Sequence, residues 1–174
     1  MGVERLFTNI LGTPVVDDDF KRPIAFVRDV LIDPERGNLI ALVVDISRNL
    51  VVAPIDILAW GEAIRVPAHD AIVEGKEIFR VAEVQKNGIR IFHNRVETKK
   101  KEYIGNVVDF SIDSQSLTLR KLYTSKSILG LLRYDHRIIP AKNIEEVFPK
   151  KIIVKENAQH VYQESKAMIE EAVA

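Results

Sequence analysis

The sequence predicts a mainly β protein with two small antiparallel β-barrels in tandem and an amphipathic C-terminal α-helix. Three observations favour this fold class: a stretch of sequence that recurs at an offset of 80 residues, short apolar runs between turn residues, and a helical stripe near the C-terminus. The boundaries that follow are 1–75 for the first barrel, 76–88 for a linker that a short helix would suit, 89–155 for the second barrel and 156–174 for the C-terminal helix.

The repeat is clearest between residues 24–33 and 104–113, where five of ten aligned positions are identical. Further alignments pair Leu39 with Leu117, after a turn two residues shorter, and Pro54 with Pro140. A duplicated unit accounts for all of these matches at once.

Each element of the first copy follows from a local pattern. Residues 24–32 are largely apolar with prominent β-branched and aromatic side chains, and the turn after them contains Pro34 and Gly37. Strands joined by turns this short must be antiparallel. The remaining elements expected are strands at 39–46, 51–53 and 63–66 and one helical turn at 54–58.

The C-terminal segment has the pattern of an amphipathic helix. Asn157 is a suitable N-cap, and neither glycine nor proline follows it. One stripe contains Ala158, Val161, Tyr162, Ser165, Met168, Ile169 and Ala172. The stripe packs either on its own barrel or on a partner, because an exposed apolar stripe must be covered.

Composition narrows the class of protein. The 47% of hydrophobic and 29% of charged residues are typical of a globular chain, and there is no cysteine for a disulfide, a thiolate site or a nucleophile. No apolar run has the length of a membrane span. We therefore expect a cytoplasmic protein that needs no cofactor and no metal, since the four histidines are not spaced as ligands.

The net charge of zero conceals a division along the chain. Residues 1–87 carry a net charge of −4, residues 88–155 carry +7 and residues 156–174 carry −3. A contrast of this kind suits the steering of a charged partner, although drifting surface charge produces the same pattern.

The order of these elements resembles the PRC-barrel family, which includes a cytoplasmic domain of the photosynthetic reaction-centre H subunit and the C-terminal domain of the ribosome maturation factor RimM. In the first copy the resemblance rests on Val16, Ile24, Val27, Asp29, Ile32, Asp33, Leu39, Val44, Val52, Pro54 and Leu58. In the second copy it rests on Val96, Ile104, Gly105, Val107, Asp109, Ile112, Asp113, Leu117, Ile139, Pro140 and Ile144. The resemblance implies a small barrel that binds and organises other proteins, or helps to assemble a ribosomal subunit, and implies no shared chemistry.

Candidate binding residues form three groups. Trp60 is either an anchor for a partner or an aromatic plug at a barrel end. Leu129, Leu131, Leu132 and Arg133 form either a buried hairpin arm or a docking loop. Lys99, Lys100 and Lys101 lie in a turn and would suit phosphate groups.

No motif for a nucleophile, a phosphate-binding loop or a pair of catalytic carboxylates is present, so we do not expect an enzyme. The leading hypothesis is a non-catalytic adaptor or assembly module that binds a protein partner or a second copy of itself. The alternative is an RNA- or ribosome-associated factor that uses the basic second copy.

Overall fold

The chain divides into two compact units, each described here by itself. The computed structural model describes residues 2–19, 22–127 and 134–157. Unit 1 comprises Met1–Ile89 and Ser111–Leu119, and unit 2 comprises Arg90–Phe110 and Arg120–Ala174. Residues 111–119, which the sequence analysis assigned to the second barrel, therefore pack with unit 1.

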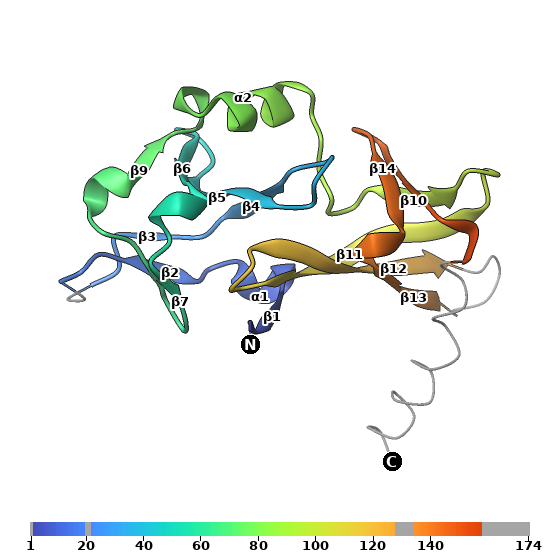
Figure 1. Ribbon diagram of the computed structural model, residues 1–174, viewed down its shortest axis with the longest axis horizontal. Coiled ribbons are helices and arrows are strands. Elements are labelled where there is room, and N and C mark those ends of the chain that lie inside the picture. The colour runs from blue at the N-terminus through green and yellow to red at the C-terminus, as the bar shows by residue number, and fades with distance from the viewer. Residues whose placement is uncertain (1, 20–21, 128–133, 158–174) are drawn as a thin grey trace, which may run out of the picture. The chain divides into compact units, whose positions relative to one another are not determined.

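Unit 1 is built mainly from short strands (Figure 1). Its strands are β1 (Glu4–Leu6), β2 (Pro14–Val16), β3 (Ala25–Phe26), β4 (Asp29–Ile32), β5 (Leu39–Asp45), β6 (Leu50–Val52), β7 (Ala59–Trp60), β8 (Ile64–Arg65) and β9 (Ile72–Glu74). Its helices are α1 (Phe7–Ile10) and α2 (Phe79–Lys86), and its single 3-10 turns are η1 (Pro54–Asp56), η2 (His69–Ala71) and η3 (Gly75–Glu77).

These strands form two four-stranded sheets, with the orders β3-β2-β8-β7 and β4-β5-β6-β9. Consecutive strands are antiparallel, but β2 and β8 are parallel, with Val15 opposite Ile64. β1 pairs with the end of β11, where Arg5 lies opposite Ile112.

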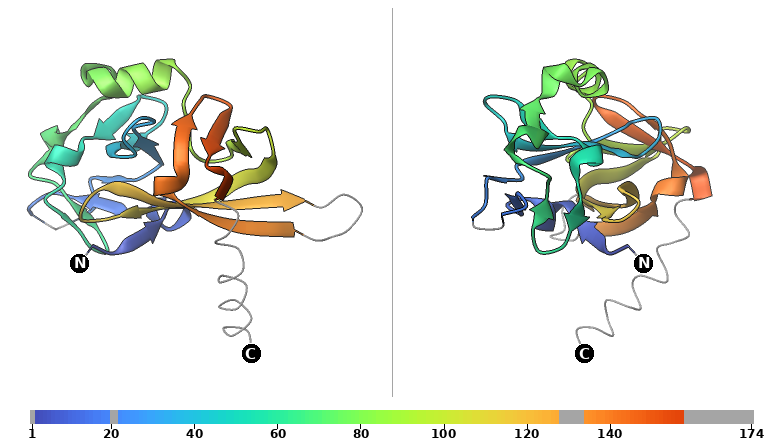
Figure 2. Two further views of the ribbon diagram at one scale, coloured as in Figure 1. Left: turned by 45° about the vertical axis from the view of Figure 1, so that its right-hand side comes forward. Right: turned by 60° about the vertical axis from the view of Figure 1, so that its left-hand side comes forward.

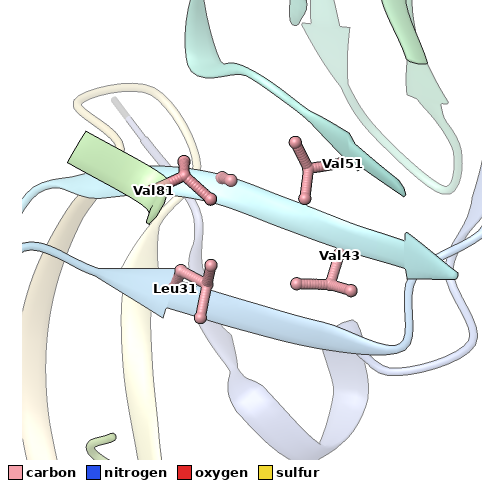
Figure 3. Packing of buried hydrophobic residues seen from close by; sticks show 5 residues of the cluster. Leu31, Val43, Val51 and Val81 are labelled. Atoms are coloured by element: carbon pink, nitrogen blue, oxygen red, sulfur yellow. The ribbon is translucent and has the colours of Figure 1, made fainter. Parts of the chain in front are cut away.

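The predicted helix in residues 76–88 is present as α2, and it packs into the core of unit 1. Val81 on α2 is fully buried and faces Leu31, Val43 and Val51, which come from β4, β5 and β6 (Figure 3). Gly88, just beyond the helix, has a φ of 65°, which suits a helix C-terminus.

Unit 2 is organised around one continuous sheet. Its strands are β10 (Arg95–Thr98), β11 (Tyr103–Asp113), β12 (Thr118–Ser127), β13 (Tyr134–Pro140), β14 (Ile144–Val147) and β15 (Lys151–Val154), with η4 (Ala141–Asn143) between β13 and β14. The order is β13-β12-β11-β10-β15-β14. The long antiparallel strands β12 and β13 lie side by side in the yellow-to-orange part of the chain (Figure 2).

The two units share a strand order. The path β3-β2-β8-β7 of unit 1 corresponds to β11-β10-β15-β14 of unit 2. The middle pair is parallel in both cases, β2 with β8 and β10 with β15, while the outer pairs are antiparallel.

Two equivalent turns correct the sequence alignment. Gly37 donates its N–H to the Asp33 carbonyl at 2.8 Å, and Leu117 donates to the Asp113 carbonyl at 2.9 Å. Gly37 and Leu117 also share a positive φ, 70° and 53°. Leu117 is thus the equivalent of Gly37 and not of Leu39, and the turn is not shortened. The alignment was wrong because it matched leucine side chains rather than backbone roles.

The alignment of Pro54 with Pro140 is also wrong, by one position. Val52 lies opposite Leu42, and Ile139 lies opposite Leu122, so Val52 and Ile139 are equivalent. Pro54 is therefore the first residue of η1, whereas Pro140 is the residue before η4. Both positions tolerate proline because neither needs a backbone N–H.

The sheets of the described residues do not close into a barrel. The prediction of two antiparallel barrels is therefore correct only for the mainly β class. The parallel pairs, β2 with β8 and β10 with β15, join strands that are far apart in the sequence and are not connected by a hairpin, and only hairpin partners must be antiparallel. The predicted helix at 156–174 lies almost wholly outside the described residues.

Candidate functional site: an open seam in unit 1

β3 is an edge strand whose backbone faces outward at Phe26. Phe26 lies opposite Pro14 of β2, and proline has no N–H to donate. The next residue, Val27, donates its N–H to the Thr13 carbonyl at 3.0 Å. Because backbone groups of successive residues point to opposite sides of a strand, the N–H and C=O of Phe26 point away from β2, towards the free edge.

This free edge is covered at one end only. Arg28 donates its N–H to the Val43 carbonyl of β5 at 2.7 Å, so β5 protects the chain at that point. β5 ends at Asp45, and the edge at Phe26 is left uncovered by a strand within the described part of the chain.

A cavity of about 250 Å³ lies at this point, and we call it the seam cavity. Its apolar lining comes from Ile24, Ala25, Phe26, Val44, Leu50 and Ile72. Its polar lining comes from Arg28, Asp45, Arg48 and His69. Small-molecule sites usually measure about 300–1,000 Å³, so the seam cavity has room for one or two side chains rather than for a large ligand.

In unit 2 the equivalent seam is closed by β12. Gly105 and Ser125 correspond to Ala25 and Asp45 at the offset of 80. A Cβ added to Gly105 would lie only 2.7 Å from the Ser125 carbonyl oxygen, so the two backbones approach at a distance that a side chain would prevent. Ala25 carries that Cβ in unit 1, where β5 ends at Asp45, whereas β12 continues to Ser127.

The charges around the seam cavity are unequal. Asp45 accepts hydrogen bonds from the Arg48 N–H at 3.0 Å and from the Ser47 hydroxyl at 2.8 Å, and it pairs with the Arg48 guanidinium at 2.8 Å. These interactions, first of all the backbone N–H of Arg48, lower the pKa of Asp45 to about 2. Arg28 is exposed and has no ion pair within residues 2–19, 22–127 and 134–157. The seam cavity therefore presents one uncompensated positive charge.

The lowered pKa of Asp45 does not suit a general acid or base. A general acid or base works best with a pKa near the operating pH. The pKa of Asp45 is about 2, so its carboxyl group is already ionised at neutral pH. Among the described residues, no three side chains of His, Asp or Glu gather as a metal site.

Trp60 lies elsewhere in unit 1. It stands on β7 opposite Ile64, which in turn lies opposite Val15 on β2, so the three side chains share one face of the sheet. Val15 and Ile64 are fully buried, and the Trp60 carbonyl accepts a hydrogen bond from Arg5 at 3.3 Å. The indole Nε1 is buried without a hydrogen-bond partner in the described structure. Trp60 therefore faces the interior from the sheet edge, apart from the seam cavity.

The three predicted lysines lie in a turn of unit 2. Lys99 pairs with Glu145 at 3.2 Å, and Lys100 pairs with Glu156 at 3.7 Å. Lys101 adopts a φ of 66° and donates its N–H to the Thr98 carbonyl at 2.9 Å. Exposed pairs of this kind are weak, but they reduce the local positive charge. Leu129, Leu131, Leu132 and Arg133 lie outside the described residues.

Sequence reasoning did not identify the seam cavity. The difference between Ala25 and Gly105 was visible in the aligned repeats, and it is the signal that distinguishes the open seam from the closed one. Of the predicted site residues, Trp60 belongs to unit 1 and the lysines belong to unit 2, and none of these four lines the cavity.

None of the helices in the described residues is long and apolar enough to span a membrane.

Comparison with known proteins supports one family. No curated protein gave a significant match to the chain. Residues 2–87 match the family model described as the PRC-barrel domain, and this match covers the first copy together with α2. The chain therefore contains a PRC-barrel domain, which spans residues 2–87.

Proposed function

We propose that the protein is a non-catalytic, protein-binding module that acts as an adaptor or in assembly. The observation that carries this proposal is the seam cavity, which combines an apolar lining with the charge of Arg28, for which the described residues supply no ion pair. Its size suits side chains of a partner better than a cofactor. The PRC-barrel match agrees with a module that acts by binding other proteins at its surface.

We further propose that unit 2 is a second, diverged copy of the same domain. The shared strand order with a parallel pair in the middle supports this reading. So do the equivalent turns, in which Asp33 Oδ1 accepts the N–H groups of Glu35 and Arg36, and Asp113 Oδ1 accepts those of Gln115 and Ser116. Divergence at the seam then gives the two copies different surfaces.

Affinity capture from the organism that encodes the protein tests the adaptor role. The tagged full chain is compared with Arg28→Glu, which alters the seam cavity, and with a triple variant in which Lys99, Lys100 and Lys101 are changed to glutamate. We expect a partner that is retained by the wild-type chain and lost with one of the variants. Capture of the same proteins by all three chains, at the level of an unrelated bait, would contradict the proposal.

The alternative function, in RNA binding or ribosome assembly, rests on the basic second copy. Its net charge of +7 favours phosphate binding, while the ion pairs of Lys99 and Lys100 with glutamates oppose it. A gel-shift assay with RNA over a salt series separates the two functions. A shift at low salt that the triple lysine variant loses would favour RNA, and no shift at low salt would exclude it.

A further inference from the structure

We infer that the seam cavity binds an extended acidic and apolar segment of a partner protein, which adds a strand to the free edge of β3. This inference rests on the proposed protein-binding function and assigns to it a site and a class of ligand. Three features carry it: the backbone at Phe26 that no strand of the described residues covers, the volume of the seam cavity, and Arg28, which has no ion pair among those residues.

The backbone at Phe26 provides the first contact. Its N–H and C=O point to the free edge of β3, as the pairing with Pro14 requires. An edge strand with exposed backbone groups is a template for another strand, and domains that bind extended peptides use this mode. An incoming strand forms its main-chain hydrogen bonds with Phe26 and places alternate side chains towards the cavity.

Unit 2 contains an internal precedent for this mode of binding. There, β12 lies next to β11 and continues to Ser127, so a strand of the chain itself covers the edge that corresponds to β3. The close approach of Gly105 to the Ser125 carbonyl shows how near that covering strand lies. In unit 1, β5 stops at Asp45, and no strand of the described part of the chain takes the place that the end of β12 has in unit 2; the seam cavity lies at this point.

The lining of the cavity determines the side chains that it accepts. Ile24, Val44, Leu50 and Ile72 form an apolar lining, and a volume of about 250 Å³ holds one or two side chains. An aliphatic or aromatic residue of the ligand fits this space, and its burial contributes about 25 cal/mol per Å² of apolar surface.

Arg28 determines the charge that the ligand carries. It is exposed at the cavity and has no ion pair within the described residues, whereas the carboxylate of Asp45 is already occupied by Ser47 and Arg48. A carboxylate of the ligand beside the apolar anchor pairs with Arg28, because guanidinium and carboxylate groups match in charge and geometry. A basic ligand finds no free carboxylate in the cavity lining.

Selection from random peptides displayed on phage tests the inference with the immobilised full chain. We expect the selected peptides to share an apolar residue flanked by aspartate or glutamate. In fluorescence polarisation, Arg28→Glu weakens their binding by about tenfold or more, since a hydrogen bond to a charged group is lost. Arg36→Glu, a matched change at an exposed arginine outside the cavity lining, leaves the affinity unchanged. Exchange of the peptide carboxylate for lysine restores binding to the Arg28→Glu chain.

Two further measurements test the strand geometry. The amide of Phe26 is expected to exchange slowly with deuterium in the complex and rapidly in the free chain. N-methylation of the peptide is expected to abolish binding at alternate residues only. Selection without a consensus, or a consensus that Arg28→Glu binds equally well, would overturn the inference. Affinity capture of a specific partner that is insensitive to Arg28→Glu would then leave the adaptor function standing without this site.

Discussion

Two aspartate–arginine pairs of unit 1 show how burial determines the contribution of an ion pair to stability. Asp33 has a side chain only 9% exposed and pairs with Arg80 at 2.9 Å. Asp45 pairs with Arg48 at 2.8 Å, but the Arg48 side chain is 74% exposed. Water screens the second pair, while without Arg80 the buried carboxylate of Asp33 would lose its ion pair and keep only the hydrogen bonds from the backbone N–H groups of Glu35 and Arg36.

Asp33→Asn is therefore expected to destabilise the protein. The change removes the charge that faces Arg80 and weakens the hydrogen bonds from Arg80 Nε and Nη2, at 3.1 and 2.9 Å. We expect the free energy of unfolding at pH 7 to fall by about 2 kcal/mol. Asp45→Asn is the matched control and is expected to unfold at nearly the wild-type denaturant concentration. Equal losses for both variants in urea titrations would contradict this assignment.

The effect of Asp33→Asn is also expected to depend on pH. Burial raises the pKa of Asp33, but the hydrogen bonds from Arg80, Glu35 and Arg36 outweigh it, so the pKa in the folded chain lies below its usual value. The carboxylate therefore contributes its full stabilisation above the pKa of the unfolded chain, about 3.9, and loses it as the pH falls through the lower folded pKa. The difference between wild type and variant in urea titrations should shrink below about pH 4.

At the scale of elements, α2 belongs to the core of unit 1. Val81 is fully buried, whereas Phe79 on the same helix is 82% exposed. Val81→Ala is expected to lower the free energy of unfolding by about 2 kcal/mol, because it leaves a space between α2 and the strands. Phe79→Ala, which removes a larger side chain, is expected to have little effect. A larger loss of unfolding free energy from Phe79→Ala than from Val81→Ala in urea titrations would mean that α2 packs through the face that carries Phe79.

The closed seam of unit 2 depends on Gly105. Its φ of 147° and the contact of 2.7 Å that a Cβ would make with the Ser125 carbonyl both favour glycine. Gly105→Ala is expected to loosen the pairing of β11 with β12 and to cost about 2 kcal/mol or more. Hydrogen exchange should become faster for the amides of residues 120–127. The reverse change, Ala25→Gly, is the control in unit 1 and should leave these amides unaffected.

The sequence was sufficient to predict individual strands and turns, but it was not sufficient to predict whether the strands of a unit close at the seam. Alternating apolar runs and turn residues such as Pro34 and Gly37 predict strands and turns because these signals are local. The open seam depends on where β5 ends and on whether Ala25 leaves room for a neighbouring backbone, and both are long-range properties. Leu117 was misplaced for a similar reason, since a leucine with positive φ is rare and only the hydrogen bond to Asp113 reveals its role.

At the scale of the whole molecule, the boundary of unit 1 does not follow the chain. Residues 111–119 belong to it, although Arg90–Phe110, which is part of unit 2, separates them from Ile89 in the sequence. They supply Ile112, which is fully buried, and Ser111, whose hydroxyl donates to Glu4 at 2.6 Å. The sequence boundaries at 75 and 89 separate this segment from the residues that it contacts.

A fragment ending at residue 89 is therefore expected to be incomplete. It would lose the β1 ladder and two reciprocal hydrogen bonds of 2.8 Å, from Leu39 to the Leu117 carbonyl and from Leu119 to the Gly37 carbonyl. We expect circular dichroism to show a lower melting temperature than for a matched chain in which a flexible linker attaches residues 111–119. This chain restores the contacts without adding unit 2, so any gain in stability comes from the segment itself. Identical melting of the two chains would instead show that residues 2–89 form a complete domain.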